Sequence, residues 1–409
     1  MRSFPLGIFP KLTTLGIGYC DNLESLCLIE GVVLSHLNSL RVYNCPNLVC
    51  FPQGGLPTPN LTRLEFLECK KLKSLPERVH TLTALEKLQI TNLPNLESIA
   101  EDGGLPPNLR DFSIDNCERL RASSSSVGDY CNWGLQALVS LEEFRIGGRG
   151  SDEILETLLK QQLLPTTLRS LWIEELSSLK SLDGKGLAHL TFLRSLSIIR
   201  CKSLEFLPGE ALQHLTSLQK LYINACPSLQ FLPEEGLPPS LSNLSIYNCS
   251  ALEKRYQNKT GQDHWASISH IPCIKINGQH LLLENYCHNE GRRKGSPGNI
   301  PTDRHQMSHT FRLRASVGEH WDLQGLVSLE EFTIGGRGSD DILEMLLPST
   351  LYILHINRLS SLKSLDRKGL KNITSLYFLS ISKCFSREKR YKRRQEKIGP
   401  TYLTFLVSR

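Results

Sequence analysis

The sequence predicts an α/β solenoid of leucine-rich repeats, with a curved parallel β-sheet on the concave face and irregular loops and short helices on the convex face. Three observations lead to this prediction: a leucine pattern that recurs, the even spacing of its copies, and the turn residues that follow each copy. The chain has 409 residues, more than the roughly 250–300 that one compact core serves, so a core that grows by stacking also suits its length.

The recurring pattern is Leu-x-x-Leu-x-Ile-x-x-Cys-x-x-Leu, as in residues 193–204 and again in residues 218–229. Most copies start 23–27 residues apart, within the period of leucine-rich repeats. The second leucine and the isoleucine are two residues apart, so a strand of about 3–5 residues turns both to one buried face. The copies start at Leu12, Leu37, Leu61, Leu85, Leu109, Leu141, Leu168, Leu193, Leu218, Leu241, Leu329, Leu351 and Leu376.

Eight of the 13 cysteines occupy one position of the repeat, three residues after the isoleucine. There the chain leaves the strand and turns inward, so the thiol can fill a small buried slot and point its S–H at a backbone carbonyl. Successive copies form a line rather than a tetrahedral cluster, so we expect packed thiols and no metal site there. For the chain as a whole, an odd count of cysteines without a secretory signal favours reduced, buried thiols. These residues are Cys20, Cys45, Cys69, Cys117, Cys201, Cys226, Cys249 and Cys384.

The segments that return to the next strand are irregular. Some contain Gly-Leu-Pro, as at residues 55–57, 104–106 and 236–238, and proline there prevents a long helix. Others favour one or two helical turns, as at residues 212–218. We therefore expect short helices and loops on the convex face.

The pattern divides the chain into five segments. A solenoid needs a polar unit over its last core layer, and a stretch rich in Gly, Pro, Arg, Asn and His without periodicity is typical of a disordered linker. The predicted segments are a first array (1–252), a C-terminal cap (253–278), a linker (279–311), a duplicated block (312–385), and a basic tail that is a degraded copy of the cap (386–409).

The duplicated block is nearly identical in sequence to part of the first array. Residues 326–332 copy residues 138–144, residues 334–340 copy 146–152, and residues 359–366 copy 176–183. Since the first repeat starts close to Met1, we expect the first array to open without an N-terminal cap.

One loop resembles a phosphate cradle. Gly147-Gly148-Arg149-Gly150-Ser151 follows a strand and precedes a helical pattern, but Asp152 and Glu153 place negative charge where a phosphate would bind. We therefore expect a turn, with Ser151 or Asp152 as the helix N-cap. No metal-protease, hydrolase or P-loop motif occurs in the sequence, so it predicts no enzyme, no cofactor and no metal.

The net charge of +6 lies largely in two local runs, Arg292–Lys294 and Arg387–Lys397, so nucleic-acid binding is not expected. No apolar run is long enough to span a membrane. The sequence therefore predicts a cytoplasmic protein, and the basic tail leaves a nuclear location open.

The concave face is the candidate binding surface. Strand positions between the buried leucine and isoleucine, and those just after the isoleucine, point to solvent. Tyr, Trp and Arg there suit protein binding, although β-propensity alone also favours aromatic residues in strands. Trp172 and Tyr222 are the expected anchors, with Arg145 and Arg200 adding charge complementarity. The candidate protein-binding residues are Arg41, Tyr43, Arg145, Trp172, Glu174, Arg200, Tyr222 and Tyr247.

The repeat line, the Gly-Leu-Pro returns and the phrase His-Ile-Pro-Cys-Ile-Lys-Ile-Asn-Gly at residues 270–278 resemble the leucine-rich-repeat region of plant coiled-coil nucleotide-binding disease-resistance proteins. The resemblance covers nearly all of residues 12–278 and again roughly 312–391. It implies a recognition and regulatory module whose partner is a pathogen effector or a host protein, and which contacts a nucleotide-binding module in related proteins. Neither that module nor a coiled coil is present in this sequence, so nucleotide binding is not implied.

Two other interpretations remain open at this point. Leucine-rich repeats also serve as substrate-recognition subunits of ubiquitin ligases, although no F-box-like helical segment precedes Leu12. The duplication also fits a non-functional, truncated or fused resistance-gene fragment.

Overall fold

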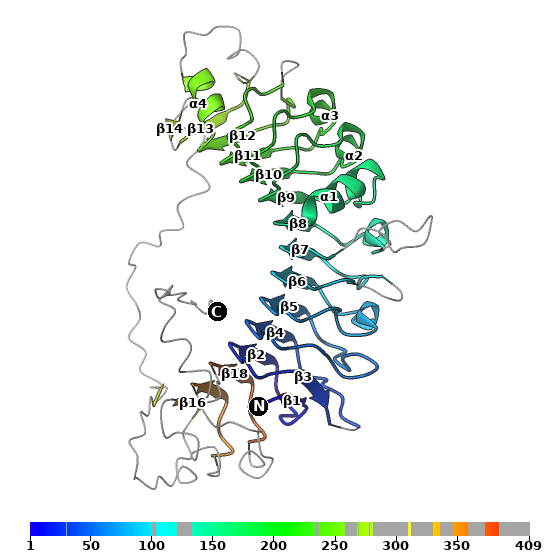
Figure 1. Cartoon of the computed structure of the whole chain (residues 1–409), viewed down its shortest axis with the longest axis vertical. Helices are drawn as coiled ribbons and strands as arrows, with labels where there is room; N and C mark the ends of the chain where they lie inside the picture. The colour runs from blue at the N-terminus through cyan, green and yellow to red at the C-terminus, as the bar shows by residue number, and fades with distance from the viewer. Residues whose placement is uncertain are drawn as a thin grey trace, which may run out of the picture.

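The computed structural model shows a single elongated solenoid (Figure 1). Its main sheet has 16 strands, and all neighbouring pairs are parallel except the last pair, β13 with β14. The described residues are 1–29, 31–99, 104–120, 133–233, 237–257, 268, 270–277, 279–280, 310–311, 330–335, 347–358 and 373–383.

Each repeat of the first array contributes one strand, so the predicted fold class is confirmed. Strand β2 and strands β4 to β12 hold the second leucine and the isoleucine of successive copies, or the residue that replaces them. The strands are β2 (Thr14–Gly18), β4 (Ser39–Tyr43), β5 (Arg63–Leu67), β6 (Lys87–Thr91), β7 (Asp111–Asp115), β8 (Glu143–Gly147), β9 (Ser170–Glu174), β10 (Ser195–Ile199), β11 (Lys220–Asn224) and β12 (Asn243–Tyr247), followed by β13 (Cys273–Ile276) and β14 (Gln279–His280).

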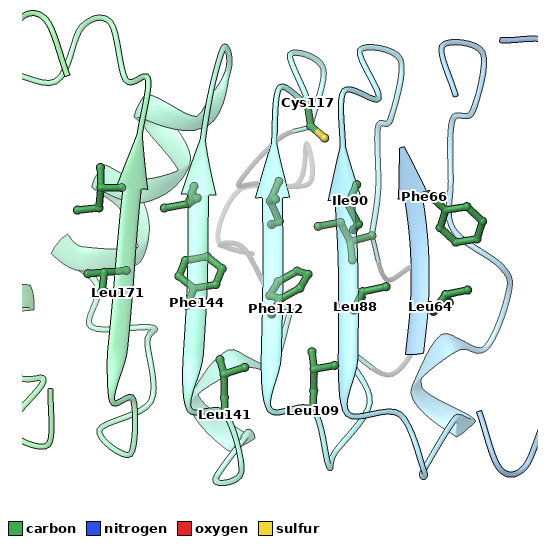
Figure 2. Packing of buried hydrophobic residues seen from close by; sticks show 14 of the residues in the cluster. Leu64, Phe66, Leu88, Ile90, Leu109, Phe112, Cys117, Leu141, Phe144 and Leu171 are labelled. Carbon is green, nitrogen blue, oxygen red and sulfur yellow. The ribbon is translucent and has the colours of Figure 1, made fainter. Parts of the chain in front are cut away.

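The core lies behind the sheet as columns of like residues. Because the strands pair in register, Leu196 lies beside Leu221 and Ile198 beside Ile223, and all four side chains are almost fully buried. Figure 2 shows the same columns in β5 to β9, where Phe112 and Phe144 take leucine positions. Their ring centroids are 5.6 Å apart, a favourable distance for an aromatic pair.

A left-handed residue ends nearly every strand. Its φ lies between +47 and +57°. Except at Asn248 and Asn277, its N–H donates to the last carbonyl of the next strand, as from Arg200 to Asn224 (2.8 Å) and from Ala225 to Tyr247 (2.9 Å). This turn directs the next residue, the repeat cysteine, into the core. The non-glycine residues at this position are Tyr19, Asn44, Glu68, Asn92, Asn116, Glu175, Arg200, Ala225, Asn248, Asn277, Arg358 and Lys383.

The seven described repeat cysteines behave as predicted. All are buried free thiols, and each Sγ faces the carbonyl two residues earlier, at 3.2 Å for Cys249 and 3.6 Å for Cys201. Burial raises the pKa of both Cys69 and Cys117 to about 12. Cys384 lies outside the described residues. Cys273, which is not a repeat cysteine, is disulfide-bonded, so the expectation of reduced thiols is wrong there.

The convex returns are short helices and loops, as expected. The helical turns predicted at residues 212–218 lie mostly before that range: α3 spans Gly209–Gln213, and only tight turns follow it. The helices are η1 (Val79–Thr81), η2 (Leu135–Ala137), α1 (Ser151–Lys160), α2 (Gly184–Ala188), α3 (Gly209–Gln213) and α4 (Ser250–Gln257). None of the helices among the described residues has the length and apolarity needed to cross a membrane.

The prediction for the N-cap of α1 is wrong. Gly150, with φ of +84°, is the N-cap, and Ser151 and Asp152 are already helical. A side chain at Gly150 would collide with the Glu118 backbone, which explains the glycine. The Asp152 carboxylate instead accepts from the N–H groups of Ser178 (2.9 Å) and Leu179 (3.0 Å) in the next repeat.

The N-terminal edge of the first array is covered rather than open. The duplicated block contributes β16 (Glu331–Gly335), β17 (Ile353–Asn357) and β18 (Phe378–Ser382), and β18 pairs with β2. The block therefore precedes the first array in space although it follows it in sequence (Figure 1). A separate pair, β1 (Ser3–Leu6) with β3 (Ser25–Leu28), lies behind β2 and buries Phe4 and Leu6. The short β15 (Thr310–Phe311) ends the sheet beyond β16.

Candidate functional site

The outward strand residues form rows across the concave face. Arg145, Trp172 and Tyr222 lie in the central row, each between two buried neighbours on its own strand. Glu174 and Tyr247 lie in the next row, at the ends of β9 and β12. Arg200 is one residue past the end of β10, in the left-handed turn, and so does not share the central row.

The two expected anchors, Trp172 and Tyr222, lie on β9 and β11, with only β10 between them. Ser197 of β10 pairs with Trp172 on one side and with Tyr222 on the other. It is only 3% exposed although it points outward, because its side chain is small and the flanking aromatic side chains are large. The Tyr222 and Tyr247 rings follow at a centroid distance of 5.7 Å. We call Trp172, Ser197, Tyr222 and Tyr247 the aromatic patch.

Hydrogen bonds and charge hold the rings of the aromatic patch. Trp172 Nε1 donates to Ser170 Oγ at 3.0 Å, and Asn224 Nδ2 donates to the Tyr222 hydroxyl at 3.0 Å. The Arg145 guanidinium lies 4.8 Å from the centroid of the Trp172 ring, a cation–π contact. The patch is thus oriented before any partner arrives, which lowers the entropy that binding must overcome.

Acidic residues border the aromatic patch on the side of β7. Asp115, Gly147 and Glu174 are opposite one another on β7, β8 and β9. A Cβ at Gly147 would lie 2.6 Å from the Glu174 carbonyl oxygen, so this row stays closely packed only with glycine in the middle. Burial raises the pKa of Asp115, and the charges of Glu174 and Glu175 add to the effect.

Arg200 is engaged within the molecule. Its guanidinium pairs with Glu174 and with Glu175, the latter at 2.6 Å. All three side chains are about half exposed, so the pairs are screened by water and each contributes at most about 1 kcal/mol. A partner that uses Arg200 would have to displace these carboxylates.

Arg41 and Tyr43 form a second group near the N-terminal edge. Arg41 pairs with Glu65 at 3.2 Å and lies 5.5 Å from the Tyr43 ring centroid. Tyr43 makes an edge contact with Tyr19 at 5.3 Å and covers Gly18, where an added Cβ would meet the ring at 2.0 Å. Burial raises the pKa of Tyr43. Three strands, β5 to β7, separate this group from Arg145, so the eight predicted residues fall into two groups on the same concave face.

Sequence reasoning missed Ser197, which belongs to the aromatic patch, and Ser170 and Asn224, which hold its rings by hydrogen bonds. The signal was available, because aligning the repeat copies places Ser197 between Trp172 and Tyr222 and Asn224 two residues after Tyr222. The same alignment also shows that Arg41 and Tyr43 belong to a repeat several copies before those of the aromatic patch.

A groove of about 660 Å³ lies on the opposite, convex side, over α2 and α3. Its walls include the exposed rings of Phe206 and Phe231, and the Arg255 guanidinium lies 5.8 Å from the Phe231 centroid. Lys185, Glu210 and His214 supply its charged or titratable side chains. Within the described part of the chain, no group of three or more His, Cys, Asp or Glu residues could hold a metal ion.

Comparisons with known proteins support the resemblance seen in the sequence. No protein-family model matches the chain. Over 190 residues it is 36% identical to "Putative disease resistance protein At3g14460" of Arabidopsis thaliana, a match that covers 45% of this chain and 12% of that protein. The solenoid and this relative together fit a leucine-rich-repeat region of the disease-resistance type.

Among solved structures, the chain is similar to TLR13 in "Crystal structure of TLR13-ssRNA13 complex". The TM-score is 0.37 at 14% identity, covering 89% of this chain and 54% of that one. A likeness of this size supports no inference about ligands.

Proposed function

We propose that the chain is a recognition and regulatory module of a plant intracellular immune receptor and binds a protein partner through its concave face. The partner class is a pathogen effector or a host protein. The observation that carries the proposal is the aromatic patch, whose rings are partly exposed and already oriented. The similarity to a disease resistance protein supports the biological setting, and the regulatory part of the proposal depends on that similarity.

The aromatic patch has the composition of an interface hot spot. Trp and Tyr bury large areas with few rotatable bonds, and a rigid sheet holds them in place. Here Trp172 and Tyr222 flank a small residue, Ser197, and leave it only 3% exposed, so the rings themselves form the surface that a partner would contact. Arg145 adds a charge at the border that a partner carboxylate could approach, although it already pairs with Glu143 at 3.2 Å.

The test starts by capturing the partner on the aromatic patch itself. A photo-reactive phenylalanine analogue replaces Tyr222 in the chain expressed in infected leaf tissue, and the captured protein is identified by mass spectrometry. The same analogue at Phe192, which is 61% exposed on a convex return, is the matched control. We expect a protein captured from position 222 and not from position 192.

Affinity measurements with the purified partner then decide the proposal. Trp172→Ala and Tyr222→Ala should each weaken binding by about 1–3 kcal/mol, roughly 5- to 150-fold, while the melting temperature stays nearly unchanged. Phe192→Ala should leave the affinity unaltered. If both patch variants bind as tightly as the original chain, recognition takes place elsewhere, and the convex groove at Phe206 and Phe231 becomes the next surface to examine.

A further inference from the structure

Two adjacent arginines, Arg169 and Arg194, lie at the edge of the concave face where the strands of the aromatic patch begin. Each comes directly before its strand, β9 or β10, and both are exposed. Their backbones are in contact, because the Arg194 N–H donates to the Arg169 carbonyl at 2.8 Å. We call these two residues the arginine pair.

Neither member of the arginine pair forms an ion pair with a residue in the described part of the chain. The ion pairs nearby on the concave face are made by Arg145 and Arg200 instead. Glu142 is the neighbour of Arg169 on the side of β8, and its carbonyl accepts from the Arg169 N–H at 2.9 Å, but its carboxylate does not pair with the guanidinium. The two charges are therefore available to a partner without the loss of an internal contact.

The next charge along this edge is also positive. Lys220, the first residue of β11, is exposed, and its N–H donates to the Arg194 carbonyl at 2.9 Å. Like charges on neighbouring strands destabilise a sheet. The free chain therefore carries an electrostatic cost along β9 to β11, which an anionic group on a partner would relieve.

The repeat itself does not require arginine at these two positions. Residues 351–383 align with residues 168–200 without a gap, and there the positions of the arginine pair are occupied by Tyr352 and Tyr377, whose rings stack at 4.9 Å. In the repeat of β11 the same position is occupied by Gln219. The buried leucines and isoleucines that follow are identical in the two aligned segments. The arginine pair is thus a property of this surface and not of the packing beneath it.

The arginine pair borders the aromatic patch at a distance that an extended peptide can match. Trp172 is three residues after Arg169, or about 10 Å along the strand. Its Nε1 donates to Ser170 Oγ at 3.0 Å, so the polar edge of the indole faces the start of the strand. A partner segment that runs along the strands reaches both sites if an apolar side chain and a carboxylate are about three residues apart, because it advances by the same rise per residue.

The acidic residues beside the patch lie at its opposite border. Glu174 is five residues after Arg169, or about 16 Å along the strand. Exposed charges are screened beyond about 8 Å at physiological ionic strength, so Glu174 and Glu175 repel a carboxylate at the arginine pair only weakly. A nucleic-acid strand lying across the patch would place phosphates near both borders. A protein segment with its carboxylates on one side fits this charge distribution better.

We propose that the partner contacts the aromatic patch through an acidic segment whose Asp or Glu carboxylates bind Arg169 and Arg194. The guanidinium group presents a planar fork of N–H donors that matches a carboxylate, so two adjacent arginines favour a segment with more than one acidic residue. This inference names the chemistry of the partner at the concave face and rests on the function proposed above.

Peptides selected on the whole chain provide the probe. A phage-displayed library of random peptides of about 15 residues, long enough when extended to cross the patch, is selected on the full chain. Binders that lose affinity for the Trp172→Ala variant occupy the aromatic patch. Compared with the unselected library, we expect these binders to be enriched in Asp and Glu within a few positions of an apolar or aromatic residue.

An Arg169→Gln, Arg194→Gln double variant then measures the contribution of the charges to the binding of one such peptide. Gln219 shows that glutamine suits this position of the repeat. The affinity should fall roughly 10-fold, mainly through slower association, and should depend less on salt than in the original chain. Lys70→Gln, Lys71→Gln is the matched control, since it removes two charges from an exposed turn beyond β5 and should leave the affinity unchanged.

A peptide with its Asp and Glu replaced by Asn and Gln should bind the original chain and the double variant equally well. If the peptides that depend on Trp172 show no acidic enrichment and bind the double variant as tightly as the original chain, this inference is overturned while the concave-face proposal stands. Binders that are all insensitive to Trp172→Ala would overturn both. A labelled oligouridine RNA that binds more tightly than the peptides, and is lost in the double variant, would assign the arginine pair to phosphate and also overturn the inference.

Discussion

At the scale of the residue, the left-handed turn after each strand is the most demanding position of the repeat. Residues other than glycine, asparagine and aspartate adopt this conformation at a cost of roughly 1–2 kcal/mol. Asparagine occupies it in several repeats, including Asn44 and Asn92, whereas Ala225 has no polar group to compensate. The N–H of Ala225 still donates to Tyr247, which holds the turn.

Ala225→Gly should therefore stabilise the chain. Relief of the backbone strain exceeds the entropy that glycine adds to the unfolded state, so we expect a gain of about 0.5–1 kcal/mol in the free energy of unfolding. Chemical denaturation measures it. The control is Ala211→Gly in α3, where φ is helical and the same change should cost about 1 kcal/mol. A loss of stability at position 225 would show that the turn tolerates alanine without strain.

The buried thiols make stability depend on alkaline pH. Burial raises the pKa of Cys69 and Cys117 from 9.0 in the unfolded chain to about 12 in the folded one. Between these values the unfolded thiols ionise while the folded ones stay neutral. Their contribution to stability is complete below pH 9 and is lost as the pH rises toward 12, by up to about 1.4 kcal/mol per pH unit for each thiol.

The expected result is a steeper loss of stability above pH 9 in the original chain than in the Cys69→Ala, Cys117→Ala double variant. Denaturant titrations at pH 8, 9 and 10 give the two slopes. The variant will be less stable at every pH because of the cavities it contains, so the slopes are compared and not the absolute values. Parallel slopes would mean that these thiols ionise as easily in the folded chain as in the unfolded one.

At the scale of the element, α1 is tied to the following repeat by a carboxylate. Asp152 lies in the first turn of α1, where its charge also suits the helix dipole. Its oxygen accepts two N–H groups of the next return, which would otherwise lack a protein partner in the described structure. The acidic residue that counted against phosphate binding in the sequence thus serves a structural purpose.

Asp152→Ala should lower the free energy of unfolding by about 1–3 kcal/mol, because charge-assisted hydrogen bonds to two backbone groups are lost. Glu153→Ala is the control, since Glu153 is exposed on the same turn and should change stability by less than about 0.5 kcal/mol. Hydrogen exchange should show faster opening at Ser178 and Leu179 in the Asp152 variant alone. Equal effects of the two substitutions would assign the loss to the helix dipole instead.

At the scale of the whole molecule, stability is close to a sum of repeats and of the contacts between neighbours. The junction of β18 with β2 is one such contact, and it protects the first layer of the array. Leu379 is fully buried in it, beside Leu15. A charge at this place is left without a partner in the core.

Leu379→Asp should therefore detach the duplicated block and expose the β2 edge. Hydrogen exchange should accelerate first in β2 and β4, while β9 to β12 keep their protection because several repeats separate them from the damage. Ser380→Asp, on the outward side of the same strand, is the control and should leave exchange unchanged. Uniform acceleration along the solenoid would indicate one cooperative unit instead of a chain of repeats.

The sequence by itself determined the repeat and nearly everything local to it. The two-residue spacing in Leu196-x-Ile198 dictates which side chains enter the core, and the cysteine three residues later dictates an inward turn. These features depend only on strand periodicity and on neighbours within about 25 residues, so a single copy of the repeat contains them. The outward placement of Trp172 and Tyr222 follows from the same periodicity.

Only the tertiary structure decided which residues of different repeats lie next to one another. Burial of Ser197 between two aromatic residues, the pairing of Arg200 with Glu174 and Glu175, and the docking of β18 on β2 all join residues of different repeats. Every repeat exposes nearly the same pair of edges, so the pattern cannot specify which block covers the first edge. That choice depends on the total free energy of stacking and on the reach of the connecting segment, which are properties of the whole chain.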